Sequence, residues 1–357
     1  MRRILFWLIL VSFCLNLAAC GFAPALTVPN TGFSDANFNN NYWFNGNFWV
    51  LDDQVFYLRD GFYNEGAYWS ANGKVEKLFQ ESDFNSDAWD YNLIGDIFVS
   101  DDSLYFEIVT DQKTFLYRYD LKDRSYTLVC EIPYLYRWVV VDDYFIYREH
   151  PTNNSEKQAP LCIYHLKDDT TKQVCSNVEE FGIVNGELRY ITLSDRYSLF
   201  RYDYAEDAST LIGTFPMNSD RKFSIFNFTS DFVVMYTFTK NNPDLFVYSC
   251  ASNTSSVYTL PKGINHVVAY DQYAYLVVHD EPHNQSGVIS AKENGIYRIC
   301  LADGSYEVID TKVDERTEVH VVSDDCFYIN QGQRVVYRYD YTTGTKEKIA
   351  ALKVILN

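Results

Sequence analysis

The residues of this sequence that could do chemistry are scattered, and no motif of catalysis or nucleotide binding gathers them. The chain contains no Gly-x-Gly-x-x-Gly, Walker loop, Gly-x-Ser-x-Gly or His-Glu-x-x-His. His279 and His283 have the spacing of two metal ligands on a helix, but Pro282 lies between them and prevents that helix. We therefore assign no catalytic residue, no metal and no cofactor, and we interpret this segment as a solvated loop.

A second segment has part of the pattern of a calcium loop. Oxygen ligands alternate at Asp83, Asn85 and Asp87, but the sixth position is not glycine and the twelfth is not glutamate. Two interpretations stay open. The segment is either a weak calcium site to which Asp90 contributes, or a turn that leads into the next repeat.

Paired aspartates recur along the chain. They are Asp52-Asp53, Asp101-Asp102, Asp142-Asp143 and Asp324-Asp325, and Asn185-Gly186 takes the same place once. A catalytic carboxylate pair is needed only once, whereas a tight hairpin turn is needed in every repeat. Because Asp, Asn and Gly favour such turns, these pairs predict hairpins rather than catalysis.

Cations and aromatic rings form the remaining candidate set for ligand binding. An arginine can hold a carboxylate or phosphate with two hydrogen bonds while an aromatic side chain stacks on a ring. The alternative is structural: the arginines neutralise neighbours such as Asp60 and Glu149, and the rings fill loops. The candidates are Arg59, Tyr63, Tyr136, Arg137, Trp138, Arg148, His150, His279 and His283.

Seven similar units must position these residues. The stretch from Ile97 to Cys130 reads as four short strands with alternating apolar and polar residues and turns between them. Equivalent turn positions recur on average about every 45 residues, which is the period of a propeller blade. They are Asp53, Asp102, Asp143, Gly186, Asp231, Gln272 and Asp325.

The predicted fold is therefore all-β, a seven-bladed β-propeller of four-stranded antiparallel blades spanning residues 48–357 as one domain. The connections after the second and fourth strand of each blade lie on the face opposite to the Asp-Asp turns. Those connections are the variable ones and carry most of the candidate ligand-binding residues, so we expect a ligand on that face.

The recurring Asp-Asp-x-x-x-Tyr and Leu-Tyr-Arg-Tyr-Asp strings resemble the repeats of bacterial lipoproteins with an uncharacterised β-propeller domain. These are distantly similar to the YWTD-type propellers of low-density-lipoprotein receptors and to TolB-like propellers. The resemblance covers about residues 48–351. No repeat contains Tyr-Trp-Thr-Asp, so the resemblance implies no receptor-type ligand residue here.

The N-terminus resembles a lipoprotein export signal. Arg2 and Arg3 precede an apolar segment too short to span a membrane, and Leu17-Ala-Ala-Cys20 has the form of a lipobox. We expect residues 1–19 to be a signal peptide, Cys20 to carry lipid (diacylglycerol, with palmitate-type acyl chains), and residues 20–47 to be a tether. The protein would then be anchored to the extracytoplasmic side of the cell membrane.

Charge and composition limit the partners. The formal net charge is −18 and no cluster of lysines and arginines stands free of acids, which excludes nucleic acid as a natural partner. Three functions stay open: a non-enzymatic binding or scaffold module for a protein, peptide or glycan; an extracellular polysaccharide hydrolase or lyase; and an envelope-assembly or sensor component.

The cysteines predict one disulfide. Six remain after Cys14 is removed with the signal peptide and Cys20 is lipidated, and a turn centred on Asp168-Asp169 would place Cys162 directly opposite Cys175. Export permits oxidation. The alternative is a pair of reduced, buried thiols.

Overall fold

The computed structural model describes residues 48–51, 53–59, 66–84, 93–100, 102–109, 113–132, 135–149, 159–216, 225–237, 243–260, 263–279, 294–314, 317–321, 326–331 and 335–352. The predicted signal peptide, Cys20 and the tether lie outside the described residues. Within them, no helix is long and apolar enough to cross a membrane.

Blades 1 to 4 follow one another along the chain. Blade 1 contains β1 (Phe48–Leu51), β2 (Gln54–Arg59), β3 (Gly66–Ala71) and β4 (Lys74–Gln80), followed by the 3-10 helix η1 (Glu81–Phe84). Blade 2 contains β5 (Leu93–Ser100), β6 (Ser103–Val109), β7 (Thr114–Asp120) and β8 (Ser125–Ile132). Blade 3 contains β9 (Leu135–Val141), β10 (Tyr144–Glu149), β11 (Ala159–His165) and β12 (Thr170–Val178). Blade 4 contains β13 (Glu180–Val184), β14 (Glu187–Leu193), β15 (Arg196–Asp203) and β16 (Ala208–Pro216).

Blades 5 to 7 complete the ring. Blade 5 contains β17 (Ile225–Phe228), β18 (Phe232–Tyr236), β19 (Asp244–Ser249) and β20 (Thr254–Thr259). Blade 6 contains β21 (Ile264–Tyr270), β22 (Tyr273–Val278), β23 (Gly295–Cys300) and β24 (Tyr306–Asp310). Blade 7 contains β25 (Glu318–Val321), β26 (Cys326–Gln331), β27 (Val335–Asp340) and β28 (Thr345–Ala351).

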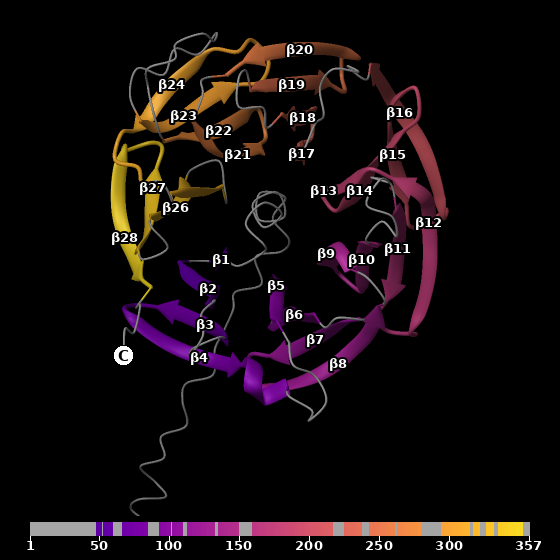
Figure 1. The fold of residues 1–357 in the computed structure, drawn as a ribbon, viewed down its shortest axis with the longest axis vertical. Helices are drawn as coiled ribbons and strands as arrows, with labels where there is room; N and C mark the ends of the chain where they lie inside the picture. The colour runs from indigo at the N-terminus through magenta and orange to yellow at the C-terminus, as the bar shows by residue number, and fades with distance from the viewer. Residues whose placement is uncertain are drawn as a thin grey trace, which may run out of the picture.

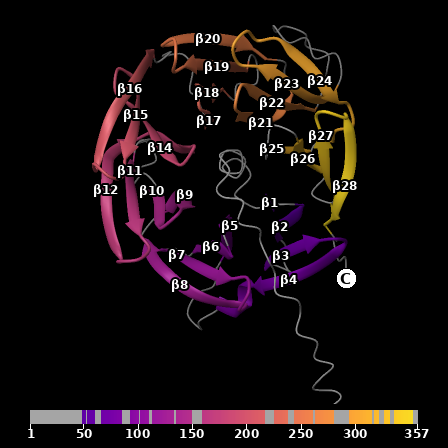
Figure 2. The same cartoon turned by 180° about the vertical axis from the view of Figure 1, so that it is seen from behind.

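Each blade is a separate antiparallel sheet of four consecutive strands. Its first strand lies nearest the centre of the ring and its fourth strand lies on the rim (Figures 1 and 2). The prediction of a seven-bladed propeller of four-stranded blades is confirmed. Because every innermost strand runs in the same direction, the ring has two distinct faces. We call the face where the innermost strands begin the entry face, and the opposite one the turn face.

Tight turns on the turn face connect the first two strands of several blades, as the paired aspartates predicted. The backbone is left-handed at Asp53 (φ 59°), Asp142 (φ 50°), Asn185 (φ 51°) and Gly186 (φ 79°). Two-residue hairpin turns of this hand match the twist of the strands they join. The turns are therefore structural features of the scaffold.

A recurring backbone hydrogen bond confirms that the turn positions are equivalent. In four blades the carbonyl of the second turn residue accepts a bond from the residue that follows the third strand. The bonds run from Leu121 to Asp102, from Leu166 to Asp143, from Cys250 to Asp231 and from Leu301 to Gln272, at 2.8 to 2.9 Å. The same contact at the same place means that each repeat folds in the same way.

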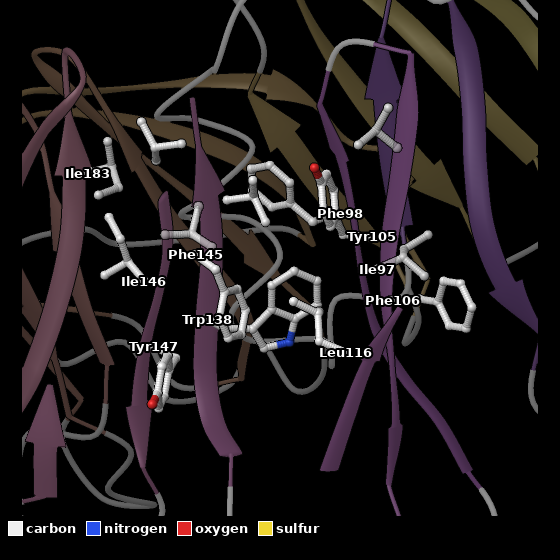
Figure 3. Close-up of a cluster of buried hydrophobic side chains, with 14 of the residues drawn as sticks. Ile97, Phe98, Tyr105, Phe106, Leu116, Trp138, Phe145, Ile146, Tyr147 and Ile183 are labelled. Atoms are coloured by element: carbon white, nitrogen blue, oxygen red, sulfur yellow. The ribbon is translucent and has the colours of Figure 1, made fainter. Parts of the chain in front are cut away.

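The core lies between neighbouring blades. Trp138 on β9 packs 6.1 Å from Phe98 on β5 and 5.7 Å from Phe145 on β10, measured between ring centroids. Figure 3 shows these side chains within the buried cluster that joins blades 2 and 3. Burial of such large rings is the main source of stability, since a single blade cannot cover its own apolar faces.

Among the described strands, the first and last blades each keep their own four and exchange none. Blade 1 consists of the first four strands and blade 7 of the last four. A shared cluster holds the two together, in which Val50 and Tyr57 pack with Val336 and Leu352. Within the described residues, side-chain packing between blades 1 and 7 therefore closes the ring.

The predicted Cys162–Cys175 disulfide is absent, and both cysteines are free. The turn between β11 and β12 pairs His165 with Thr170, so that Cys162 lies opposite Gln173. A bulge between Leu161 and Cys162 then brings Cys175 opposite Leu161. The prediction assumed a turn centred one residue further on and no bulge, and it is wrong for this reason.

Candidate functional site

Two of the predicted arginines face each other at the entry face of blade 3. Arg137 on β9 is the direct cross-strand partner of Arg148 on β10, and each is only 3% exposed. Like charges in such a position repel, and a buried charge is costly unless it has a partner. Each arginine must therefore be stabilised separately.

Arg137 is stabilised by an acid from the next blade. Its Nη1 lies 2.7 Å from Oε1 of Glu180 at the start of β13, and both side chains are at most 4% exposed. The guanidinium also lies 5.5 Å from the centroid of the Phe181 ring. This buried ion pair connects blades 3 and 4 close to the entry face.

Arg148 is held by a backbone carbonyl and an aromatic ring. Its Nε donates a hydrogen bond of 2.9 Å to the carbonyl of Val178, the last residue of β12. Its guanidinium lies 4.7 Å from the centroid of the Tyr136 ring, which is itself 43% exposed. Arg148 thus supports an exposed aromatic ring rather than presenting its own charge to solvent.

Two carboxyl groups from blade 2 adjoin this cluster. Trp138 donates from its indole nitrogen to Oε2 of Glu107 at 3.1 Å, and the backbone amide of Asp96 donates to Oε1 at 3.2 Å. The second contact exists because a bulge interrupts the pairing of β5 and β6 between Ile94 and Ile97. The bulge places Asp96 opposite Glu107, which is a known way to redirect side chains beside functional sites.

The surroundings favour protonation of both carboxyl groups. Burial raises the pKa of Asp96, and the positive charge of Arg137 opposes that rise only in part. Burial also raises the pKa of Glu107, and the neighbouring charge of Asp96 raises it further. Both side chains nevertheless keep some contact with solvent. We call Asp96 and Glu107 the carboxyl pair.

Comparison with known proteins supports the propeller fold and identifies no family. No family model and no curated protein matches the sequence. Among solved structures, the chain is similar to oligopeptidase B from Leishmania major, with a TM-score of 0.56 and 8% identity over 86% of this chain and 48% of that one. It is also similar to a post-proline cleaving enzyme from Rickettsia typhi, with a TM-score of 0.55 and 11% identity over 90% and 55%.

A third similar structure is the tricorn protease, with a TM-score of 0.53 and 10% identity over 85% of this chain and 34% of that one. The chain spans about half the length or less of these three proteins. The likeness shows the fold. At identities this low, it carries no activity over to this chain.

The structure brings together four of the nine predicted ligand-binding residues, namely Tyr136, Arg137, Trp138 and Arg148. His279 lies at the end of β22, far along the chain in blade 6, and is partly buried. The backbone of Arg59 pairs with Gly66, and its side chain is outside the described residues. Tyr63, His150 and His283 are outside them too.

The calcium interpretation is only partly covered by the structure. Asp83 accepts a hydrogen bond of 3.0 Å from the backbone of Gln80 through Oδ2, as a turn residue does, while Asn85 and Asp87 lie outside the described residues. Among the described residues, no group of three or more His, Cys, Asp and Glu side chains is placed to hold a metal ion.

Sequence reasoning missed the carboxyl pair and Glu180. A signal was present, because a glycine followed by an acid within an apolar strand, as at Gly95-Asp96, favours a bulge. Glu107 in the middle of the apolar run of β6 was a second signal. Nothing in the sequence indicates that Glu180 pairs with Arg137, since the two belong to different blades.

Proposed function

We propose that this protein is a lipid-anchored extracytoplasmic binding module that receives a peptide or glycan ligand at the entry face of blades 2 to 4. Residues 1–20 support the anchor, because a short apolar export signal ends there in a lipobox cysteine. The propeller supports the binding role, because it is a rigid scaffold whose variable connections lie on one face.

One observation carries the proposed site. The exposed Tyr136 ring packs against Arg148, and two residues along the same strand Trp138 contacts Glu107 of the carboxyl pair. A fixed aromatic ring gives contact area with little loss of conformational freedom. Carboxyl groups beside it can accept hydrogen bonds from sugar hydroxyls or from the amino groups of a peptide. The charge of Arg137 is already compensated by Glu180 and needs no ligand.

Binding to arrays tests the site. The soluble form, residues 21–357, is applied to glycan and peptide arrays, and the affinity for each positive compound is measured for the native chain and two variants. Tyr136→Ala and Asp96→Ala should each weaken binding about tenfold or more, because each removes a direct contact. The control changes the turn face, with Asp142→Asn and Asp143→Gly together, and should bind normally. Loss of binding in the control alone would place the site on the turn face.

The anchor is tested separately. Cys20→Ala should prevent attachment of lipid, so that the variant is missing from the lipid-labelled fraction while the native chain is present. Unchanged lipid labelling of the variant would refute the lipoprotein assignment and leave the binding site untouched.

A second candidate function is hydrolysis of a polysaccharide, and the carboxyl pair favours it. A carboxyl group that keeps its proton near neutral pH can act as a general acid, while a second one acts as base or nucleophile. Release of new reducing ends from a panel of polysaccharides by the native chain, and its loss in Glu107→Gln, would support this function. Binding without such release would support the module.

A further inference from the structure

The rim strand of blade 5 differs from every other rim strand of the ring. A fourth strand has one free edge, and an exposed free edge can pair with another chain. Proteins protect such edges with bulges, which twist the strand away, and with charged side chains. Both protections can be compared across the seven blades.

Bulges are present at an equivalent place in six of the seven blades. The pairing of the third and fourth strands shifts once in blades 1, 2, 4, 6 and 7, and twice in blade 3. In blade 5 the pairing of β19 with β20 is regular from Asp244–Thr259 to Ser249–Thr254. No bulge therefore interrupts the edge of β20.

Charges are also missing from this edge. The strand β20 reads Thr-Ser-Ser-Val-Tyr-Thr and contains no Asp, Glu, Lys or Arg, in a chain of net charge −18. Its first four residues are exposed, and Val257 keeps 46% of its surface accessible. The one other uncharged rim strand, β16, has a bulge. Only β20 lacks both protections.

The hydrogen-bond pattern shows which backbone groups face outward. Leu260 donates to the carbonyl of Pro243 at 2.8 Å, just beyond the end of β20. Because bonded and non-bonded pairs alternate in an antiparallel ladder, Tyr258, Ser256 and Thr254 bond to β19. The N–H and C=O groups of Ser255, Val257 and Thr259 therefore point away from the blade.

The length and charge of the edge limit what can occupy it. A strand of six residues is about 20 Å long, which is too short to bury the roughly 1,200 Å² of a stable dimer interface. A second copy would also bring the same large negative charge. One extended segment of a partner, uncharged where it meets the edge and neutral or basic at its flanks, satisfies both limits.

We propose that β20 is a docking edge, on which an extended, uncharged segment of a partner protein adds as a fifth strand of blade 5. The outward groups of Ser255, Val257 and Thr259 supply the backbone hydrogen bonds, and Val257 supplies an apolar contact. This site is separate from the entry face of blades 2 to 4, so it stands or falls independently of the function proposed above.

The experiment selects ligands from a displayed library of random twelve-residue peptides against residues 21–357. Selected peptides are synthesised, and their dissociation constants are measured by fluorescence anisotropy. Val257→Pro should weaken binding at least tenfold, because it removes an outward N–H that β19 does not use. Val257→Lys, which keeps the backbone intact, should also weaken it. Each peptide is also made in two N-methylated forms, one with the odd-numbered and one with the even-numbered backbone nitrogens methylated. Only one of these two sets of nitrogens faces β20 in a paired strand, so one form should lose binding and the other should keep it.

The matched control is Leu211→Lys, which places the same charge on the bulged edge of β16. Leu211 lies opposite Phe200 as Val257 lies opposite Phe246, and it is 53% exposed. This variant should bind the peptides like the native chain. Equal affinity of native chain and both Val257 variants would overturn the proposal, as would a library that yields no binder. Concentration-dependent dimerisation that Val257→Pro abolishes would overturn it in favour of a second copy.

Discussion

The hydroxyl of Tyr328 in blade 7 donates a hydrogen bond of 2.7 Å to Oδ1 of Asp53 in the first turn of blade 1, and the two residues are 275 positions apart in the sequence. It is a polar contact that joins the first and last blades on the turn face. Asp53 is also one of the paired aspartates that the sequence assigned to hairpin turns. The turn therefore has a second role in closing the ring.

Loss of this contact should weaken ring closure. Tyr328→Phe should lower the free energy of unfolding by about 1–2 kcal/mol, because Tyr328 is buried and its partner is a carboxylate. Urea denaturation of both single variants and the double variant with Asp53→Gly measures the coupling, since Gly tolerates the left-handed turn and has no side chain to accept the bond. A coupling energy near zero would contradict a stabilising role.

The ion pair between Arg137 and Glu180 should behave as a buried unit. Arg137→Met alone should destabilise the protein by about 3–5 kcal/mol, because it leaves the Glu180 charge without its partner. Adding Glu180→Gln should restore much of the loss. Denaturant midpoints of both single variants and the double variant provide the measurement, and a double-variant cost equal to the sum of the two single-variant costs would show that the charges act independently.

A similar argument applies to Arg148, which the sequence offered as a candidate ligand-binding residue. If Arg148 were a surface ligand contact, its replacement would leave folding intact. Because it is buried and holds the Val178 carbonyl and the Tyr136 ring, its removal should also cost stability.

The carboxyl pair should make stability depend on pH. Unfolded carboxyl groups lose their protons near pH 4, whereas burial raises the pKa values of Asp96 and Glu107 in the folded protein. Above about pH 4 the folded state thus holds protons that the unfolded state has lost, so the free energy of unfolding falls as pH rises toward those raised values. Glu107→Gln removes part of this fall.

Thermal melting at a series of pH values checks this. The melting temperature of Glu107→Gln relative to the native chain should increase from pH 4 to pH 8. Glu206→Gln, which changes an exposed glutamate, should show no such trend. A constant difference between Glu107→Gln and the native chain would refute the raised pKa.

The cysteines of the folded domain should stay reduced and react slowly. Burial raises the pKa of Cys130 to about 12 and that of Cys162 to about 11, so little of either is thiolate at pH 8. Alkylation by iodoacetamide at pH 8 should be much slower for the native chain than in guanidinium chloride. Peptide mapping without reduction that recovers a bridge between Cys162 and Cys175 would contradict the observed register.

The sequence by itself determined the blade number, the order of the strands and the turn face. These features are local and are repeated, because alternation of apolar residues and turn-forming dipeptides act within a few residues. Because the pattern is repeated, an irregular residue in one repeat does not obscure it. The turn positions that align between repeats are also equivalent in space, as the backbone bonds at Asp102, Asp143, Asp231 and Gln272 show.

Only the tertiary structure decided the register of β11 with β12 and the composition of the site. One bulge moved Cys175 opposite Leu161, and another brought the Asp96 amide to Glu107. The pairing of Arg137 with Glu180 depends on two blades packing side by side. A shift of one residue in pairing reverses which side chains meet, and such shifts arise from packing between sheets rather than from the local pattern that defines each strand.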